Sequence, residues 1–248
     1  MRLVLASASP RRAELLTSAG FTFGTLAVDA DEHLRPGEAP AMYVRRLAGE
    51  KSARGLDVAS SSSRTGAGPL TSLREGYGGP LELQRKRTPD AKAEGGHYLG
   101  GVDDLGVVVS GFGRTVAEQD IVVLGADTAV VLDGEILGKP RDDEDARAML
   151  RRLSGQRHEV LTGVSLRTVD DEMGLVEATS VWFARLTPDA IAWYVSTGEG
   201  RGKAGGYAIQ GLASRFIPRI EGSYSNVVGL PVAAVAGLLQ ALNRAHPG

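Results

Sequence analysis

The chain has 248 residues, of which 42% are hydrophobic and 5% aromatic, enough for one sizeable core or two small domains built mainly from Ala, Val and Leu. The formal net charge of −2 gives no global attraction to nucleic acid or to a membrane surface. Cysteine is absent, which excludes disulfides, thiol nucleophiles and cysteine-based metal sites. The sequence turns polar after Ala6, too early for a signal segment or a membrane span, and we expect a cytoplasmic protein.

The first part of the chain predicts one strand and two helices. Residues 3–6 are apolar and predict a short buried strand. Ser9 and Pro10 suit the N-cap and the first position of a helix. A second helix is expected from residue 39 to about residue 54, where similar residues recur at a spacing of four.

Residues 55–119 differ from the rest of the chain. This stretch contains 13 glycines, four consecutive serines at 60–63 and a basic patch at 85–87. Such a composition predicts a flexible surface insertion rather than packed structure. Three consecutive valines at 107–109 offer one additional edge strand within it.

Regular structure is expected again from residue 121 onward. The elements predicted there are, in chain order, strands at 121–124 and 129–132, a tight turn at 133–134, a helix over 142–153, strands at 159–166 and 176–186, a helix opened by 187–189, a strand near 216–220 and a final helix after Pro231. Together with the first elements they predict an α/β fold, with a mixed sheet and helices packed on it.

The segment Ser7-Ala8-Ser9-Pro10-Arg11-Arg12 lies between the first strand and the first helix. Two arginines in a first helical turn are unfavourable, because the helix dipole is already positive there, unless an anion binds. Free backbone N–H groups, the Ser7 hydroxyl and the guanidinium groups of Arg11 and Arg12 would then converge on phosphate oxygens. Taken alone, the segment also fits an ordinary helix start with solvated arginines.

A carboxylate, Asp127, lies in Gly125-Ala126-Asp127-Thr128 between two apolar runs. An unpaired carboxylate in such a place is costly, so Asp127 needs a cation, a metal or a proton. Magnesium prefers one or two carboxylates together with water and phosphate oxygens, and Glu32 offers a second carboxylate. A structural Asp and a solvated loop Glu are the simpler alternatives.

Three lysines, Lys51, Lys139 and Lys203, can pair with phosphate, although each alone also fits a surface lysine. Neither Gly-Lys pair forms a P-loop, because Pro140 and Ala204 stand where Ser or Thr is required. The four histidines lack metal-ligand spacing, and no Gly-x-Ser-x-Gly motif is present. The residues alone therefore indicate phosphate binding with a carboxylate-held metal, and leave the substrate open.

Six segments in order resemble the Maf family of nucleotide pyrophosphatases and cover nearly all of the chain outside 55–119. They are residues 5–12, 124–128, 137–140, 153–155 with 161–164, 203–211 and 222–231. The resemblance implies a fold related to the inosine triphosphate pyrophosphatases, an elongated mixed β-sheet flanked by helices. It also implies a single domain over residues 1–248, interrupted by the insertion, and a homodimer.

The resemblance assigns a role to each candidate residue. It implies that Asp127 orients or deprotonates the attacking water and, with Glu32, holds Mg²⁺ or Mn²⁺. The residues that it implies for triphosphate binding are Ser7, Arg12, Lys51, Lys139 and Lys203. The expected reaction cuts a nucleoside triphosphate into the monophosphate and pyrophosphate, for which positioning and charge neutralisation are the main requirements.

Arg11, Thr128 and Gln210 match the specificity positions of the branch that resembles dTTP/UTP pyrophosphatases. A glutamine amide can donate to and accept from a pyrimidine edge. The sister branch, which prefers 7-methyl-GTP, differs after the first Ser-x-Ser and at the Gln position. The implied role is house-cleaning of modified pyrimidine nucleotides.

Two alternatives remain at this point. One is a non-catalytic nucleotide-binding regulator of cell division, which would not need Asp127 and Glu32. The other is a phosphatase acting on a nucleoside monophosphate. The expected partners are a nucleoside triphosphate and a second copy of the chain, without nucleic acid or membrane.

Overall fold

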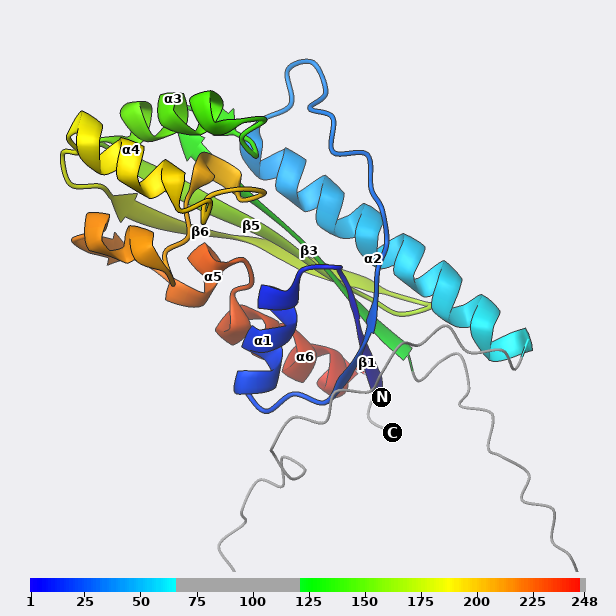
Figure 1. The fold of residues 1–248 in the computed structure, drawn as a ribbon. Helices are drawn as coiled ribbons and strands as arrows, with labels where there is room; N and C mark the ends of the chain where they lie inside the picture. The colour runs from blue at the N-terminus through cyan, green and yellow to red at the C-terminus, as the bar shows by residue number, and fades with distance from the viewer. Residues whose placement is uncertain (66–120, 246–248) are drawn as a thin grey trace, which may run out of the picture.

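The computed structural model describes residues 1–65 and 121–245 (Figure 1). The strands of the described residues are β1 (Arg2–Ala6), β2 (Phe23–Leu26), β3 (Ile121–Leu132), β4 (Glu135–Leu137), β5 (Arg157–Arg167), β6 (Glu172–Trp182) and β7 (Arg219–Glu221). They form one sheet in the order β2-β1-β3-β5-β6-β7, and β4 pairs with β3 outside this path. β1 is parallel to both neighbours and the other pairings are antiparallel, so the predicted mixed sheet is confirmed.

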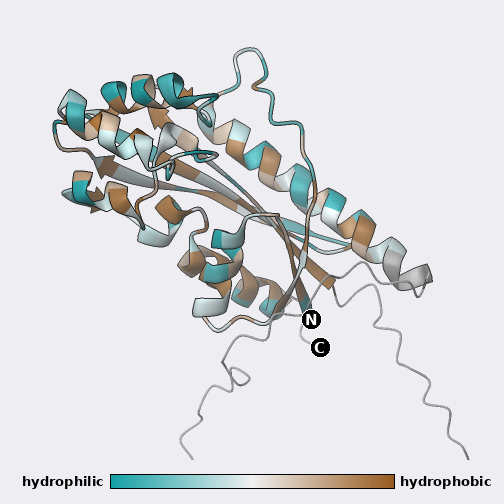
Figure 2. Ribbon diagram, viewed as in Figure 1, coloured by the Kyte–Doolittle hydropathy of each residue, from teal (hydrophilic) through white to brown (hydrophobic). Residues whose placement is uncertain are grey.

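Helices cover both faces of the sheet. They are α1 (Pro10–Ser18), α2 (Pro40–Thr65), α3 (Asp143–Leu153), α4 (Pro188–Ser196), α5 (Tyr224–Val228) and α6 (Val232–Ala245), with short 3₁₀ turns at Ala204–Gly206 and Leu212–Phe216. α2 runs along one face, and the other helices lie on the opposite face (Figure 1). The helices carry hydrophobic and hydrophilic residues in alternation along their length (Figure 2), as expected for helices with one buried side. None of the described helices combines the length and the hydropathy needed to cross a bilayer.

β3 is the central strand, and its side chains alternate between the two faces of the sheet. The even-numbered hydrophobic residues, which face the side opposite α2, are Val122, Leu124, Ala126, Val130 and Leu132. The odd-numbered hydrophobic residues, which face α2, are Ile121, Val123, Ala129 and Val131. Asp127 and Thr128 interrupt this packing in the middle of the strand, one on each face. The two polar residues therefore stand where the core on each side divides.

Glycines bring α2 unusually close to the sheet. A Cβ atom on Gly125 would lie 2.2 Å from the Ala48 carbonyl oxygen, and one on Gly163 would lie 2.2 Å from the Val44 carbonyl oxygen. Only glycine fits at such an approach of strand to helix backbone. Because α2 lies so close to β3, the Lys51 side chain on α2 can reach Asp127 on β3.

One edge of β3 is shared by two strands that do not meet. β1 pairs with β3 as far as Gly125, and β4 pairs with it only from Val130 onward. β5 occupies the other edge throughout this region. Among the described strands, residues 126–129 therefore have no neighbour on the β1–β4 edge, and groups from both faces of β3 can reach the same space.

Most of the predicted elements are confirmed. The structure contains the first strand, the helix starting at Pro10, the Asp133-Gly134 turn and the helices near 143, 188 and 232. Ser9 is the N-cap of α1, although its side chain makes no capping hydrogen bond. β5 and β6 are confirmed with shifted ends.

Three expectations need correction. Residues 121–132 form one continuous strand rather than two, because Asp127 and Thr128 fit the alternation of a strand covered on both faces. The second helix does not end near residue 54 but continues to Thr65, so the first part of the expected 55–119 insertion is helical. The strand expected near 216–220 begins only at Arg219, since Phe216 closes a 3₁₀ turn.

The rest of the expected insertion lies outside the described residues, as do the valines at 107–109 and the basic patch at 85–87. Three elements were not predicted: β2, β4 and α5. All are short, and their sequences lack a distinct periodic pattern.

A buried histidine makes the stability of the fold depend on pH. His158 on β5 packs edge-on against Phe183 and Tyr207, and its Nε2 lies 2.8 Å from the Tyr207 hydroxyl. Burial lowers the pKa of His158 to about 4. Between pH 6.5 and 4 the unfolded chain binds this proton and the folded chain does not, so acidification favours unfolding.

We therefore expect His158→Gln to remove about 3 kcal/mol of the stability difference between pH 7 and pH 4, measured by urea unfolding at both values. The amide of Gln can still bond the Tyr207 hydroxyl. His33→Gln, which changes an exposed histidine, is the control. If the unfolding free energy of His158→Gln depended on pH as that of the wild type does, His158 would not be the source of this pH dependence.

Candidate active site

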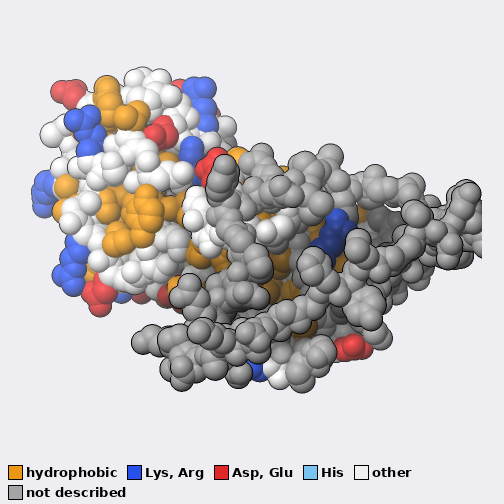
Figure 3. All heavy atoms as spheres, turned by 90° about the horizontal axis from the view of Figure 1, so that it is seen from below, with side chains coloured by type: hydrophobic (Ala, Val, Ile, Leu, Met, Phe, Trp, Pro, Cys, Tyr) orange, Lys and Arg blue, Asp and Glu red, His pale blue; other side chains and the backbone are white. Residues whose placement is uncertain are grey.

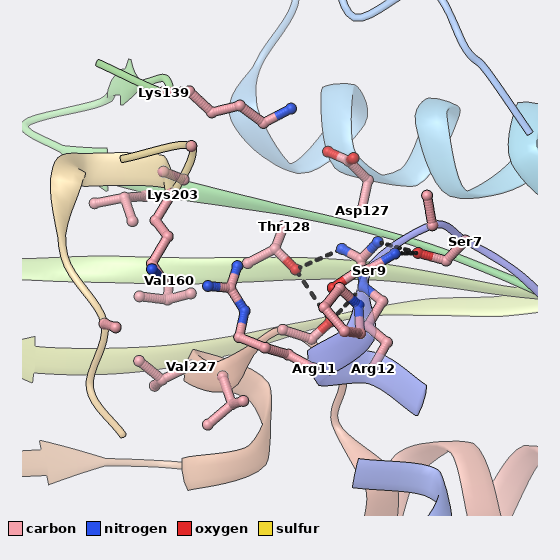
Figure 4. Close-up of a pocket in the computed structure, with 18 of the residues that line it drawn as sticks. Ser7, Ser9, Arg11, Arg12, Asp127, Thr128, Lys139, Val160, Lys203 and Val227 are labelled. Carbon is pink, nitrogen blue, oxygen red and sulfur yellow. Dashed lines mark hydrogen bonds between the residues drawn. The ribbon is translucent and has the colours of Figure 1, made fainter. Parts of the chain in front are cut away.

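A cleft of about 1050 Å³ opens at the free edge of β3 (Figure 4). Its lining includes all ten residues singled out from the sequence: Ser7, Arg11, Arg12, Glu32, Lys51, Asp127, Thr128, Lys139, Lys203 and Gln210. They come from β1–α1, the β2–α2 loop, α2, β3, the β4–α3 loop and the loop after α4. The structure thus brings together residues that are separated by up to two hundred positions in the chain.

Arg12 is fixed at the base of the cleft. Its Nε donates to the Gly229 carbonyl at 2.8 Å, its Nη1 to the Ser7 hydroxyl at 3.2 Å and its Nη2 to the Thr128 hydroxyl at 3.1 Å. Burial lowers the pKa of Arg12, while the Asp127 carboxylate opposes that shift. Three of its five N–H groups are thus engaged, so Arg12 is a fixed positive charge that also orients Ser7 and Thr128.

Arg11 and Lys203 extend toward one another from opposite walls of the cleft (Figure 4). The Nε of Arg11 is buried and finds no hydrogen-bond partner among the described residues. Lys203 donates to the Glu199 carbonyl. Burial lowers the pKa of Lys203, and the nearby Arg11 charge lowers it further. Two cations that repel one another in a cleft are stabilised when an anion enters between them.

Asp127, Lys51, Glu32 and Lys139 form a chain of alternating charges. The Lys51 ammonium lies 2.7 Å from Asp127 Oδ1 and 3.5 Å from Glu32 Oε1, and Lys139 Nζ lies 2.8 Å from Glu32 Oε2. Asp127 and Lys51 are buried. The alternative of a surface lysine is wrong for Lys51, because its side chain is buried and lines the cleft beside Asp127.

The ionisation of Glu32 is governed by these lysines. Its partial burial would raise the pKa, but the hydrogen bond and charge of Lys139, followed by the charge of Lys51, lower it below the ordinary value. Glu32 is therefore a carboxylate at neutral pH. Two anionic oxygen donors, on Asp127 and Glu32, thus contact the same ammonium group.

The donor set suits a divalent cation that shares its coordination with a ligand. In the described part of the chain no group of three or more His, Asp or Glu side chains is arranged to hold a metal alone. Magnesium binds through one or two carboxylates and completes its shell with water and phosphate oxygens. Asp127 and Glu32 match that pattern, since they stand beside the cationic residues that would bind the phosphates.

The cleft also has apolar lining. Side chains of Val160 and Val227 line it on the side of Arg11 and Lys203 (Figure 4), and the Tyr207–Gly211 segment that carries Gln210 belongs to the same lining. Gln210 is exposed there. The cleft therefore combines cationic groups with apolar walls and one amide, as a ligand with a phosphate chain and a planar ring would require.

Several residues at the site were not identified from the sequence. The Gly229 carbonyl fixes Arg12, and the Thr162 hydroxyl lies 3.0 Å from that of Thr128. The Glu199 carboxylate accepts hydrogen bonds from Tyr194 and from the backbone of Leu212. Gly229 and Thr162 lie in the conspicuous segments 222–231 and 161–164, but a carbonyl or a threonine carries no signal of such a role.

The fold and the cleft define an α/β protein whose cleft gathers cationic side chains next to two carboxylates suited to a divalent cation. A family model described as Maf-like protein matches residues 2–242. The chain belongs to this family.

Named relatives match nearly the full length of the chain. A dTTP/UTP pyrophosphatase of Anaeromyxobacter dehalogenans (strain 2CP-C) is 43% identical over 243 residues, covering 96% of this chain and 93% of the relative. A protein of the same name from Pseudoalteromonas atlantica is 38% identical and covers 98% of both chains. Another from Hahella chejuensis is 40% identical, with 96% and 91% covered.

Proposed function

We propose that this protein is a metal-dependent nucleoside triphosphate pyrophosphatase that acts on dTTP and UTP. The observation that carries the proposal is the convergence of Arg12, Lys51 and Lys139 on the same cleft as the carboxylates of Asp127 and Glu32. The names of the relatives support the substrate, and the phosphate-binding character of the cleft supports the class of reaction.

The cationic groups would hold the triphosphate chain. The side chains that would do so all line the cleft: Ser7, Arg12, Lys51, Lys139 and Lys203. When bound, Mg²⁺ or Mn²⁺ neutralises phosphate charge and makes water a better nucleophile. Asp127 and Glu32 are the residues that would hold the cation.

Asp127 is the proton acceptor in this proposal. The water oxygen forms a bond either to the α-phosphorus, with pyrophosphate as the leaving group, or to the β-phosphorus, with the nucleoside monophosphate as the leaving group. In both cases the bond from the attacked phosphorus to the α,β-bridging oxygen breaks. The carboxylate of Asp127 takes the proton of the water. The Lys51 ammonium, 2.7 Å from Asp127 Oδ1, holds this carboxylate in place in the cleft.

Product analysis tests the proposal directly. The purified protein is incubated with dTTP, UTP, CTP and 7-methyl-GTP, with Mg²⁺ and with EDTA, and pyrophosphate and orthophosphate are assayed separately. We expect metal-dependent pyrophosphate, fastest from dTTP or UTP. Orthophosphate from a nucleoside monophosphate would favour the phosphatase alternative, and no product would favour the non-catalytic regulator.

Gln210 is proposed to select the base. Gln210→Ala should raise KM for dTTP and UTP about fivefold, with kcat little changed, because one hydrogen bond contributes about 1 kcal/mol. Preference over 7-methyl-GTP should fall by a similar factor. Gln240→Ala, on the exposed side of α6, is the matched control. A loss of kcat without a change in base preference would remove Gln210 from this role.

We also propose that residues 1–248 act as one catalytic domain and assemble as a homodimer in the cytoplasm, where nucleoside triphosphates are made and used. Hydrophobic side chains gather on one face of the molecule (Figure 3), which supports self-association. Large exposed hydrophobic residues of the described chain include Trp193, Leu212 and Tyr224. The mass in solution, measured by light scattering, tests the dimer.

A further inference from the structure

The loop that carries Glu32 has little of its own to hold it in place. Residues 27–39 connect β2 to α2 without a helix or a strand, and the loop runs alongside α2 before that helix begins (Figure 1). Val28 packs against the hydrophobic core, but Asp31, His33 and Leu34 are exposed, so the residues beside Glu32 are not packed into the core. Holding Glu32 in the cleft therefore costs this part of the loop conformational entropy.

Side chains of α2 anchor the loop: Arg54 donates to the Asp29 carbonyl at 2.6 Å, and two others bind the backbone around Glu32. Arg46 Nη1 donates to the Asp31 carbonyl at 3.3 Å, and Arg46 Nη2 donates to the His33 carbonyl at 3.1 Å. Between them, the Tyr43 hydroxyl donates to the Glu32 carbonyl at 3.0 Å. Three consecutive carbonyls, centred on Glu32, are thus held by residues one helical turn apart on α2.

Arg46 is itself held rigidly. Its Nε and Nη2 donate to the two carboxylate oxygens of Glu38 at 2.6 and 2.8 Å. Only 12% of the Arg46 side chain and 8% of the Glu38 side chain are exposed. The hydrogen bond from Arg46 lowers the pKa of Glu38 to about 2, so the pair stays charged throughout the neutral range. The Arg46 guanidinium also lies 5.5 Å from the centre of the Tyr43 ring.

We propose that Arg46, assisted by Tyr43, is a positioning residue that presents the Glu32 carboxylate to the cleft. The inference rests on the proposed function, in which Glu32 holds a divalent cation. Arg46 acts through the backbone on either side of Glu32, while the Glu32 side chain remains available to the cleft and to Lys51 and Lys139.

The test measures binding of Mn²⁺, in the presence of the α,β-methylene analogue of UTP, by the loss of the free Mn²⁺ signal in electron paramagnetic resonance. Arg46→Lys keeps the charge but loses the planar fork that spans two carbonyls. We expect it to weaken Mn²⁺ binding about tenfold, as is usual for the loss of a residue that orients a metal ligand. Tyr43→Phe, which removes one hydrogen bond, should have a smaller effect in the same direction.

Arg45→Lys is the matched control. Arg45 is the neighbour of Arg46 on α2 and pairs with Glu172 at 2.9 Å, away from the loop. The Arg45→Lys variant should bind Mn²⁺ as tightly as the wild type. Melting temperatures of all variants separate a loss of positioning from a general loss of stability.

A double-mutant cycle with Glu32→Gln decides whether Arg46 acts through Glu32. If it does, Glu32→Gln/Arg46→Lys binds Mn²⁺ no more weakly than Glu32→Gln alone. Equal binding by Arg46→Lys and wild type, or additive effects in the double variant, would overturn the inference. Absence of Mn²⁺ binding in the wild type would instead overturn the proposed function.

Discussion

Asp127→Asn is expected to lower kcat for dTTP at least 1000-fold, or about 4 kcal/mol of barrier. The amide is nearly the same size and can still accept a hydrogen bond from Lys51, which lies 2.7 Å from Oδ1. It cannot take the proton of water or offer an anionic oxygen to a cation. Steady-state kinetics with a pyrophosphate assay measure the loss, and circular dichroism checks the fold.

The control for this variant is Asp133→Asn, at the end of the same strand. Asp133 has a φ of 52° in the turn, a conformation that Asn accepts readily. The Asp133→Asn variant should retain full activity. Activity of Asp127→Asn within about tenfold of wild type, about 1.4 kcal/mol, would remove Asp127 from its proposed role.

Gly125→Ala should be strongly destabilising. The added Cβ would lie 2.2 Å from the Ala48 carbonyl oxygen and 2.6 Å from the Ser52 backbone nitrogen, so α2 must move away from β3. Overpacking against backbone costs about 3 kcal/mol. The same movement would separate Lys51 from Asp127 and reduce activity.

Urea unfolding measures the loss of stability of Gly125→Ala, and kcat/KM measures its loss of activity. Gly138→Ala is the control, because a Cβ there meets no atom within 4 Å. A change in unfolding free energy of less than about 0.5 kcal/mol for Gly125→Ala, the range of an ordinary surface substitution, would contradict the close packing described for α2.

Local sequence was enough to single out residues that the structure brings to one cleft, because each belongs to a short segment with its own chemical signature. Arg11 and Arg12 stand in a helix start that suits an anion, and Asp127 interrupts an apolar run. The sequence could not predict how these segments meet. Parallel pairing of β1 with β3, with Ala6 opposite Gly125, places the start of the Ser7–Arg12 segment beside Asp127.

The errors have a common cause, which is tertiary packing that overrides local signals. Gly55 and the serines after it argue against a helix, yet α2 continues through them. A Cβ on Gly55 would lie 2.8 Å from Val123 and 2.9 Å from Ala6, so this glycine permits a close contact with the sheet. The role of Arg46 was equally hidden, since its partners are backbone carbonyls of a distant loop.

The free stretch of β3 between β1 and β4 has a consequence for the whole molecule. On the face opposite α2, one hydrophobic cluster lies around β1, α1 and α6, and another around β4, α3 and α4. A nucleotide bound in the cleft would contact residues beside both clusters and so link the two parts of the molecule while it is bound. Substrate occupancy should then stiffen the molecule along its long axis and raise its melting temperature as ligand concentration rises.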